Sequence, residues 1–124
     1  MDALSYYHIV FCLKKINNSH IKFMSSSSYS LESIIANFVS ITSCDNLLEA
    51  INRRSNITQN GDLIYPTQSL QIIKILDDNT KIYHDSEAFY DDPNIAADYI
   101  LPTADFKEIV IAWRNFVGNN NTEL

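Results

Sequence analysis

The sequence predicts an α+β domain, with a mainly antiparallel sheet of about four to six strands packed against about three helices. Three observations support this fold class. Apolar residues recur at helical spacing in two long segments, short β-branched and aromatic runs fill much of the remaining chain, and two glycines and three prolines leave little room for linkers. With 124 residues and 46% hydrophobic side chains, we expect one globular domain over residues 1–118 and a disordered tail over residues 119–124.

The N-terminal segment is expected to form two strands. The run Tyr6–Leu13 is apolar or aromatic apart from His8, which predicts a strand buried on both faces in the middle of the sheet. The polar turn NNSH follows this run. The next run, IKFMS, is therefore expected to pair with the first strand as a hairpin.

Two helices are expected next. Ser30 is positioned to cap a helix over LESIIANFVSIT, where the apolar residues follow the i, i+3, i+4, i+7, i+8 spacing of one helical face. These residues are Leu31, Ile34, Ile35, Phe38 and Val39. A second helix is expected from about Asp45 to Arg54, because its two closing arginines suit the negative end of the helix dipole.

From Leu63 onward the pattern is typical of short strands. LIYPT is expected at a sheet edge, since Pro66 cannot donate a ladder hydrogen bond. SLQIIKIL and TKIYH predict an antiparallel hairpin across the turn DDNT. An acidic loop around residues 91–94 is expected to lead into DYILP, the last short strand.

The segment TADFKEIVIAWRNFVG predicts the helix that closes the domain. Thr103 is expected to cap its N-terminus, and Gly118 is expected to end it. One apolar stripe runs along it, formed by Phe106, Ile109, Val110, Trp113, Phe116 and Val117. This stripe is expected to face the core.

The sequence indicates a cytoplasmic protein without catalytic or metal chemistry. The N-terminus has no basic leader, no apolar run approaches the roughly 18 residues of a membrane span, and Cys12 and Cys44 are expected to be reduced. His8, His20 and His84 do not stand at zinc-ligand spacing. We therefore expect no catalytic residue, no metal and no cofactor.

An acidic ribbon over residues 77–98 is the main functional feature. It carries seven acids and one base, whereas the remaining residues hold eight of each, so the whole net charge of −6 lies in this ribbon. That balance argues against nucleic acid or an anionic membrane as partner and favours a cationic protein. Aromatic residues alternate with the acids, as is typical of interfaces. The alternative is a solvated face that only keeps the protein soluble.

The ribbon is accordingly predicted to be a partner-binding surface, with carboxylates supplying charge and aromatic rings acting as anchors. The predicted partner-binding residues are Asp77, Asp78, Tyr83, Asp85, Glu87, Phe89, Tyr90, Asp91, Asp92 and Asp98. Two other functions stay open. One is a small hydrolase that uses His84 with Asp85 or another nearby acid, and the other is a general adaptor protein.

The closing segment DYILPTADFKEIVIAWRNFVG resembles small bacterial immunity proteins of contact-dependent growth inhibition and related polymorphic toxin systems. Many of these end in a strand, a Pro-containing turn and a helix of pattern D-F-x-x-(I/V)-(I/V)-x-x-W-x-x-F. The matching residues are Asp105, Phe106, Ile109, Val110, Trp113 and Phe116. The resemblance implies a non-catalytic protein that binds the C-terminal domain of a cognate toxin, often a nuclease, one to one. It implies that this helix is scaffold, and it leaves the oligomeric state open.

Overall fold

The protein has an α+β fold, as the sequence predicts. The computed structural model describes residues 2–55 and 63–119, and within these residues it contains five helices and six strands. In chain order they are α1 (Ala3–Tyr6), β1 (Val10–Ile16), β2 (Ser19–Ser25), α2 (Tyr29–Ile35), α3 (Ile41–Ser55), β3 (Leu63–Pro66), β4 (Ile72–Ile75), β5 (Asn79–Tyr83), α4 (Ser86–Asp91), β6 (Tyr99–Pro102) and α5 (Thr103–Val117). Apart from Asn119, the predicted disordered tail lies outside the described residues.

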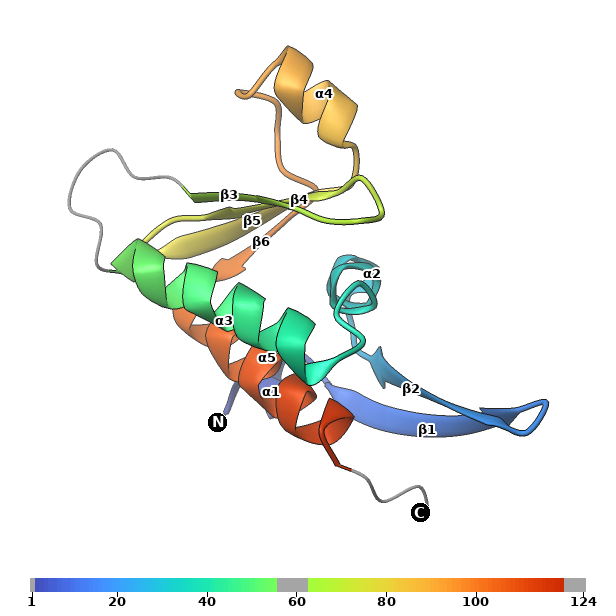
Figure 1. Ribbon diagram of the computed structural model, residues 1–124. Coiled ribbons are helices and arrows are strands. Elements are labelled where there is room, and N and C mark those ends of the chain that lie inside the picture. The colour runs from blue at the N-terminus through green and yellow to red at the C-terminus, as the bar shows by residue number, and fades with distance from the viewer. Residues whose placement is uncertain (1, 56–62, 120–124) are drawn as a thin grey trace.

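The strands form two separate antiparallel sheets, β1-β2 and β3-β4-β5-β6. In the four-stranded sheet, α3 and α5 lie against one face and α4 lies on the other side (Figure 1). Strand alternation sends Ile73, Ile75 and Ile82 toward α3 and α5, where all three are fully buried. The expected edge position of β3 and the β4–β5 hairpin are both confirmed.

The first strand differs from its prediction. Residues 3–6 form α1, capped by Asp2, whose carboxylate accepts from the Ser5 N–H at 2.8 Å. His8 then turns the chain with φ 55°, so β1 starts at Val10 and lies in the two-stranded sheet and not in the middle of the larger one. The predicted hairpin is confirmed, and Asn17 and Asn18 adopt the positive φ values, 48° and 70°, that a tight two-residue turn requires.

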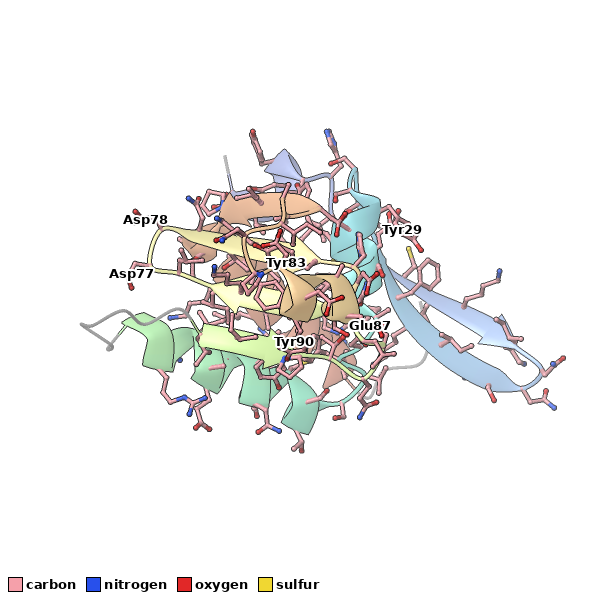
Figure 2. The ribbon with its side chains drawn as sticks, turned by 90° about the horizontal axis from the view of Figure 1, so that it is seen from above. Tyr29, Asp77, Asp78, Tyr83, Glu87 and Tyr90 are labelled. Atoms are coloured by element: carbon pink, nitrogen blue, oxygen red, sulfur yellow. The ribbon has the colours of Figure 1, made fainter. Side chains whose placement is uncertain are left out.

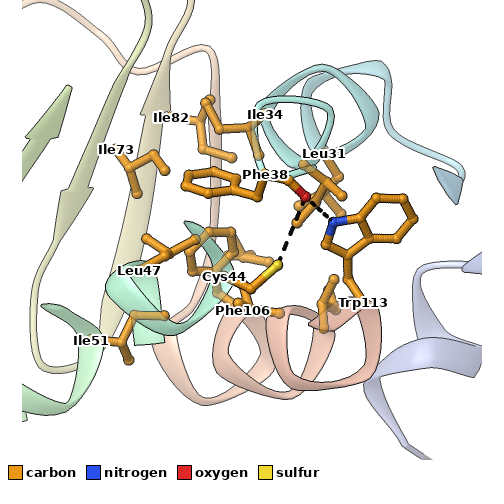
Figure 3. Packing of buried hydrophobic residues seen from close by; sticks show 14 of the residues in the cluster. Leu31, Ile34, Phe38, Cys44, Leu47, Ile51, Ile73, Ile82, Phe106 and Trp113 are labelled. Carbon is orange, nitrogen blue, oxygen red and sulfur yellow. Dashed lines mark hydrogen bonds between the residues drawn. The ribbon is translucent and has the colours of Figure 1, made fainter. Parts of the chain in front are cut away.

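The predicted long helix is interrupted. Ser28, not Ser30, caps α2, which ends at Ile35. The backbone carbonyl of Phe38 accepts from Trp113 Nε1 at 2.7 Å and from Cys44 Sγ at 3.8 Å (Figure 3). Because these two side chains hold the Phe38 carbonyl, the chain bends between the helices and a new helix, α3, begins at Ile41.

The closing helix, α5, matches its predicted span, but its ends work differently. Pro102 is the N-cap and makes no side-chain cap bond, whereas the Thr103 hydroxyl donates to the Leu76 carbonyl at 2.7 Å. Gly118 ends the helix in a right-handed conformation. A Cβ there would lie 2.7 Å from Ile41 Cδ1, so a side chain at this position would require the end of the Ile41 side chain to move.

Both cysteines are free, and we expect them to differ strongly in reactivity. Cys44 is fully buried, and burial with the nearby Asp45 carboxylate raises the pKa of its thiol to about 11, whereas Cys12 is partly exposed. A thiol-specific reagent should therefore label one cysteine in the native protein and the second only after denaturation. The Cys12→Ser variant is the control and should show no native reaction; prompt labelling of both thiols would contradict the packing around Cys44.

Candidate functional site

The middle of the acidic ribbon forms the short helix α4, which precedes the loop expected around residues 91–94 and was not predicted. Asp85 is its N-cap, with Oδ1 accepting from the Ala88 N–H at 3.2 Å, and Glu87 lies in the first turn. Asp92 ends the helix, and its Oδ1 accepts from the Asn94 N–H at 3.1 Å. The Asp85 carboxylate thus caps the N-terminus of α4, whereas the Asp92 carboxylate stabilises the turn that follows the helix.

Two of the three predicted aromatic anchors are buried under α4. Tyr83 and Phe89 are each 4% exposed, and their ring centroids lie 4.7 Å apart at an interplanar angle of 53°. Ile72, directly opposite Tyr83 on β4, completes this small cluster. The expectation that Tyr83 and Phe89 meet a partner is therefore wrong, because the apolar outer face of β4 and β5 takes both rings. They attach α4 to the sheet.

The opposite side of α4 is exposed and negatively charged. Tyr90 is 60% exposed, and its ring stands edge-on to Phe89 with centroids 5.6 Å apart. Glu87 and Asp91 are exposed on the same helix. We call this surface the α4 acidic face, formed by Asp85, Glu87, Tyr90, Asp91 and Asp92.

The ribbon does not form one continuous row of carboxylates. Asp77 and Asp78 lie in the β4–β5 turn, at the other end of the sheet from Glu87 and Tyr90 (Figure 2). The five residues of β5 separate the two groups by roughly 15 Å, at about 3.3 Å per residue. Lys74 and Lys81 pair across the strands between them. The structure therefore divides the predicted site into two acidic groups.

Asp98 belongs to the base of α4. Its Oδ2 accepts from the backbone N–H of His84 at 2.7 Å, and its own N–H donates to the Ile82 carbonyl at 2.8 Å. These two bonds tie the segment before β6 to the end of β5. The Asp98 carboxylate thus holds the chain on both sides of α4 together, although its side chain was predicted to meet a partner.

The ring of His84 lies in a polar network that joins β5 to α2. Its Nε2 lies 2.8 Å from Ser30 Oγ, and its Nδ1 lies 2.9 Å from Gln71 Nε2. Asn37 Nδ2 donates to Gln71 Oε1 at 3.0 Å, which orients the Gln71 amide with its Nε2 toward His84. His84 Nε2 then carries the ring proton and donates to Ser30. In this tautomer His84 cannot take a proton from the Ser30 hydroxyl.

The hydrolase alternative required His84 to pair with a nearby acid. In the described part of the chain, Asp85 bonds to the α4 backbone and Asp98 bonds to the His84 backbone, and neither carboxylate is seen to orient the ring. The described residues also contain no group of three His, Cys, Asp or Glu side chains that could hold a metal ion. These contacts do not favour a catalytic role for His84, and the absence of catalysis stays a prediction.

The comparisons with known proteins add no relative. No protein-family model, curated protein or solved structure matches the chain. None of the helices in the described ranges is long and apolar enough to cross a membrane.

The sequence contains a local signal for α4. In DSEAFYD, an Asp is followed two positions later by Glu, which is typical of a capped helix start with an acid in its first turn. A helix over this run places Phe89 on the opposite side from Glu87 and Asp91. The local pattern does not indicate that Tyr90 is exposed and Tyr83 is buried, because both states depend on how α4 packs on the sheet.

Proposed function

We propose that the protein is a cytoplasmic immunity protein that binds and neutralises the C-terminal domain of a cognate bacterial toxin through the α4 acidic face. One observation carries this proposal. The buried pair Tyr83 and Phe89 holds α4 on the sheet, so Glu87, Asp91 and the exposed ring of Tyr90 are presented together on a fixed support. A fixed arrangement of charges around an aromatic ring is typical of a protein-binding surface.

The charges indicate the kind of partner. Five of the chain's acids lie in or beside α4, at Asp85, Glu87, Asp91, Asp92 and Asp98, and the net charge of the chain is −6. Such a surface attracts a basic partner and opposes binding to nucleic acid. A nuclease domain fits this description, because it binds the phosphate backbone with a basic groove. Carboxylates placed in that groove would block access of the nucleic acid.

The C-terminal resemblance to immunity proteins supports the role and not the contact surface. The residues that carry it lie on α5, where Phe106, Ile109 and Val110 are fully buried and Trp113 is 2% exposed. Their side chains are therefore scaffold, as the resemblance implies. This leaves partner recognition to other parts of the molecule, and on α4 the exposed acids Glu87 and Asp91 flank the exposed ring of Tyr90.

The experiment is calorimetric titration with the C-terminal domain of whatever large toxin is encoded immediately upstream, at low and high salt, and absence of such a toxin gene would count against the role. One-to-one binding that weakens markedly with salt is expected, because exposed charge pairs are screened by ions. A growth assay with the toxin domain expressed in the same cell measures neutralisation separately. Absence of any binding would overturn the proposed role.

Reversing one charge on α4 should show whether toxin binding depends on this surface or only on the net charge of the protein. We expect Glu87→Lys to weaken toxin binding at least about tenfold, since close interfacial charge pairs contribute on the order of 1.5 kcal/mol or more. Glu49→Lys, on the exposed side of α3, changes the net charge equally and should bind like the wild type. Equal affinities for both variants, and for Glu87→Lys combined with Asp91→Lys, would move the interface away from α4.

A further inference from the structure

The β1–β2 hairpin has two faces of different character, defined by its register. One face packs on the body. Phe11 stacks on Phe116 with ring centroids 5.3 Å apart and lies 5.7 Å from the ring of Trp113, and Met24, opposite Phe11, is 5% exposed. Lys22 also lies on this face, where its ammonium donates to the Phe116 carbonyl at 2.9 Å and to the Asn119 carbonyl. These contacts fix the hairpin on the end of α5.

The other face of the hairpin is mainly apolar although it is exposed, and its polar residues are Lys14, Ser19 and Ser25. Its residues alternate with the packed ones along both strands, and they include Val10 (57% exposed), Ile16 (41%), Ile21 (45%) and Phe23 (42%), with the partly exposed Cys12 beside Phe23. We call these five residues the hairpin stripe. A water-facing strand surface is normally polar, so a contiguous stripe of this kind marks an interaction surface.

The edges of this hairpin are also open. In the described ranges, no backbone hydrogen bond joins residues 10–16 or 19–25 to a segment outside the hairpin. A depression of about 330 Å³ lies beside β2, lined in part by Ile21, Val39 and Trp113. Val39 is 76% exposed at its rim. An added extended segment would pair with the N–H and C=O groups at a hairpin edge, and its alternate side chains would extend the apolar face.

The charge of the hairpin is opposite to that of the α4 acidic face. Residues 10–25 contain three lysines and no acid. Lys22 is bound to the end of α5, while Lys14 and Lys15 are exposed near the turn, Lys14 on the face of the hairpin stripe and Lys15 on the other face. We propose that the hairpin stripe, its open edges and these two lysines bind an extended apolar segment of a protein partner that carries carboxylates. This surface is separate from α4 and does not depend on the toxin-binding role.

Two other occupants fit less well. A membrane would cover the apolar stripe, but its hydrocarbon cannot satisfy the open N–H and C=O groups of the strand edges. A second copy packed hairpin to hairpin would bring Lys14 of each chain onto one interface, where like charges repel. A carboxylate-bearing protein segment satisfies both the strand edges and the lysines.

The test uses a probe peptide, acetyl-Glu-Val-Glu-Ile-Glu-Val-Glu-amide, and its counterpart with lysine in place of glutamate. Both are titrated into the ¹⁵N-labelled full chain. We expect the acidic peptide to shift backbone amide signals of β1, β2 and the neighbouring depression, and the lysine peptide to leave them unchanged. Lys14→Glu combined with Lys15→Glu should weaken binding of the acidic peptide roughly tenfold, and Glu87→Lys should not.

A variant of the hairpin stripe is the control for this test. Phe23→Ser should weaken binding while circular dichroism and the thermal melt stay close to wild type, because Phe23 lies outside the core. No response at millimolar acidic peptide, an equal response to the lysine peptide, or shifts confined to other elements would overturn the proposal. If the acidic peptide fails to bind, two further assays identify the occupant. Binding to phosphatidylserine vesicles that depends on Phe23 would indicate a membrane, and dimerisation in sedimentation that depends on Phe23 would indicate a second copy. Loss of toxin binding in Glu87→Lys has no bearing on these outcomes.

Discussion

Replacing Phe106 by alanine is expected to lower the free energy of unfolding by about 3–5 kcal/mol. Phe106 is fully buried in the core cluster that joins α2, α3, α5 and the four-stranded sheet (Figure 3). Removing its ring leaves a cavity that the surrounding isoleucines and leucines can fill only in part. Because a domain of this size has a total stability of roughly 5–15 kcal/mol, the variant should lie close to the unfolding threshold. Urea denaturation followed by circular dichroism measures the change.

The matched control is the same substitution on the hairpin stripe. Phe23 is 42% exposed, so Phe23→Ala should lower the free energy of unfolding by less than about 1 kcal/mol. Phe106→Leu should recover most of the loss, since leucine fills much of the space. Equal effects of the two alanine substitutions would contradict the position of α5 in the core.

Replacing Phe89 by alanine should release α4 from the sheet and weaken toxin binding at least about tenfold. The Phe89 side chain is 4% exposed and packs on Tyr83 and Ile72, in a cluster separate from the main core. Its loss should remove about 3 kcal/mol from the attachment of α4, and should raise amide exchange in α4 more than in β4 and β5. Hydrogen exchange of the free protein and calorimetry with the toxin domain measure the two effects.

Tyr90→Ala distinguishes the support of α4 from its exposed face. Tyr90 is 60% exposed, so its loss should leave amide exchange in α4 unchanged and still weaken toxin binding. Phe89→Leu should restore much of the protection and the affinity. If Phe89→Ala speeds exchange without changing affinity, α4 is not the toxin-binding element.

The elements that were predicted well are those whose local pattern agrees with their final packing. The turn DDNT joins two short apolar runs, so the pairing of β4 with β5 follows from the sequence. The alternation of side chains along these strands then places Ile73 and Ile82 on the face that packs against the core. The apolar stripe of α5 has one orientation that buries it, and Phe106, Ile109 and Val110 are indeed fully buried. In these segments no distant residue competes with the local preference.

The wrong predictions concern residues whose state depends on distant parts of the chain. The helical spacing through Phe38 and Val39 is real, but Trp113 takes the Phe38 carbonyl from 75 positions away and the helix stops before it. Likewise, Tyr83 and Phe89 were predicted to be exposed because they stand among acids in the sequence. Ile72, on which the two rings pack, and the strand β4 that carries it lie outside that stretch. Sequence proximity to charge therefore did not indicate exposure.

The positions of the charged elements make the charge distribution of the molecule asymmetric. The basic β1–β2 hairpin extends from one side of the body, and the acidic α4 stands above the opposite face of the four-stranded sheet (Figure 1). When such a protein approaches a charged molecule, the electric field of that molecule acts on the separated charges and rotates the protein. A basic domain therefore turns α4 toward itself before contact, and a carboxylate-rich segment turns the hairpin toward itself. The orientation in which the chain first meets a partner is thus selected by the sign of the partner's charge.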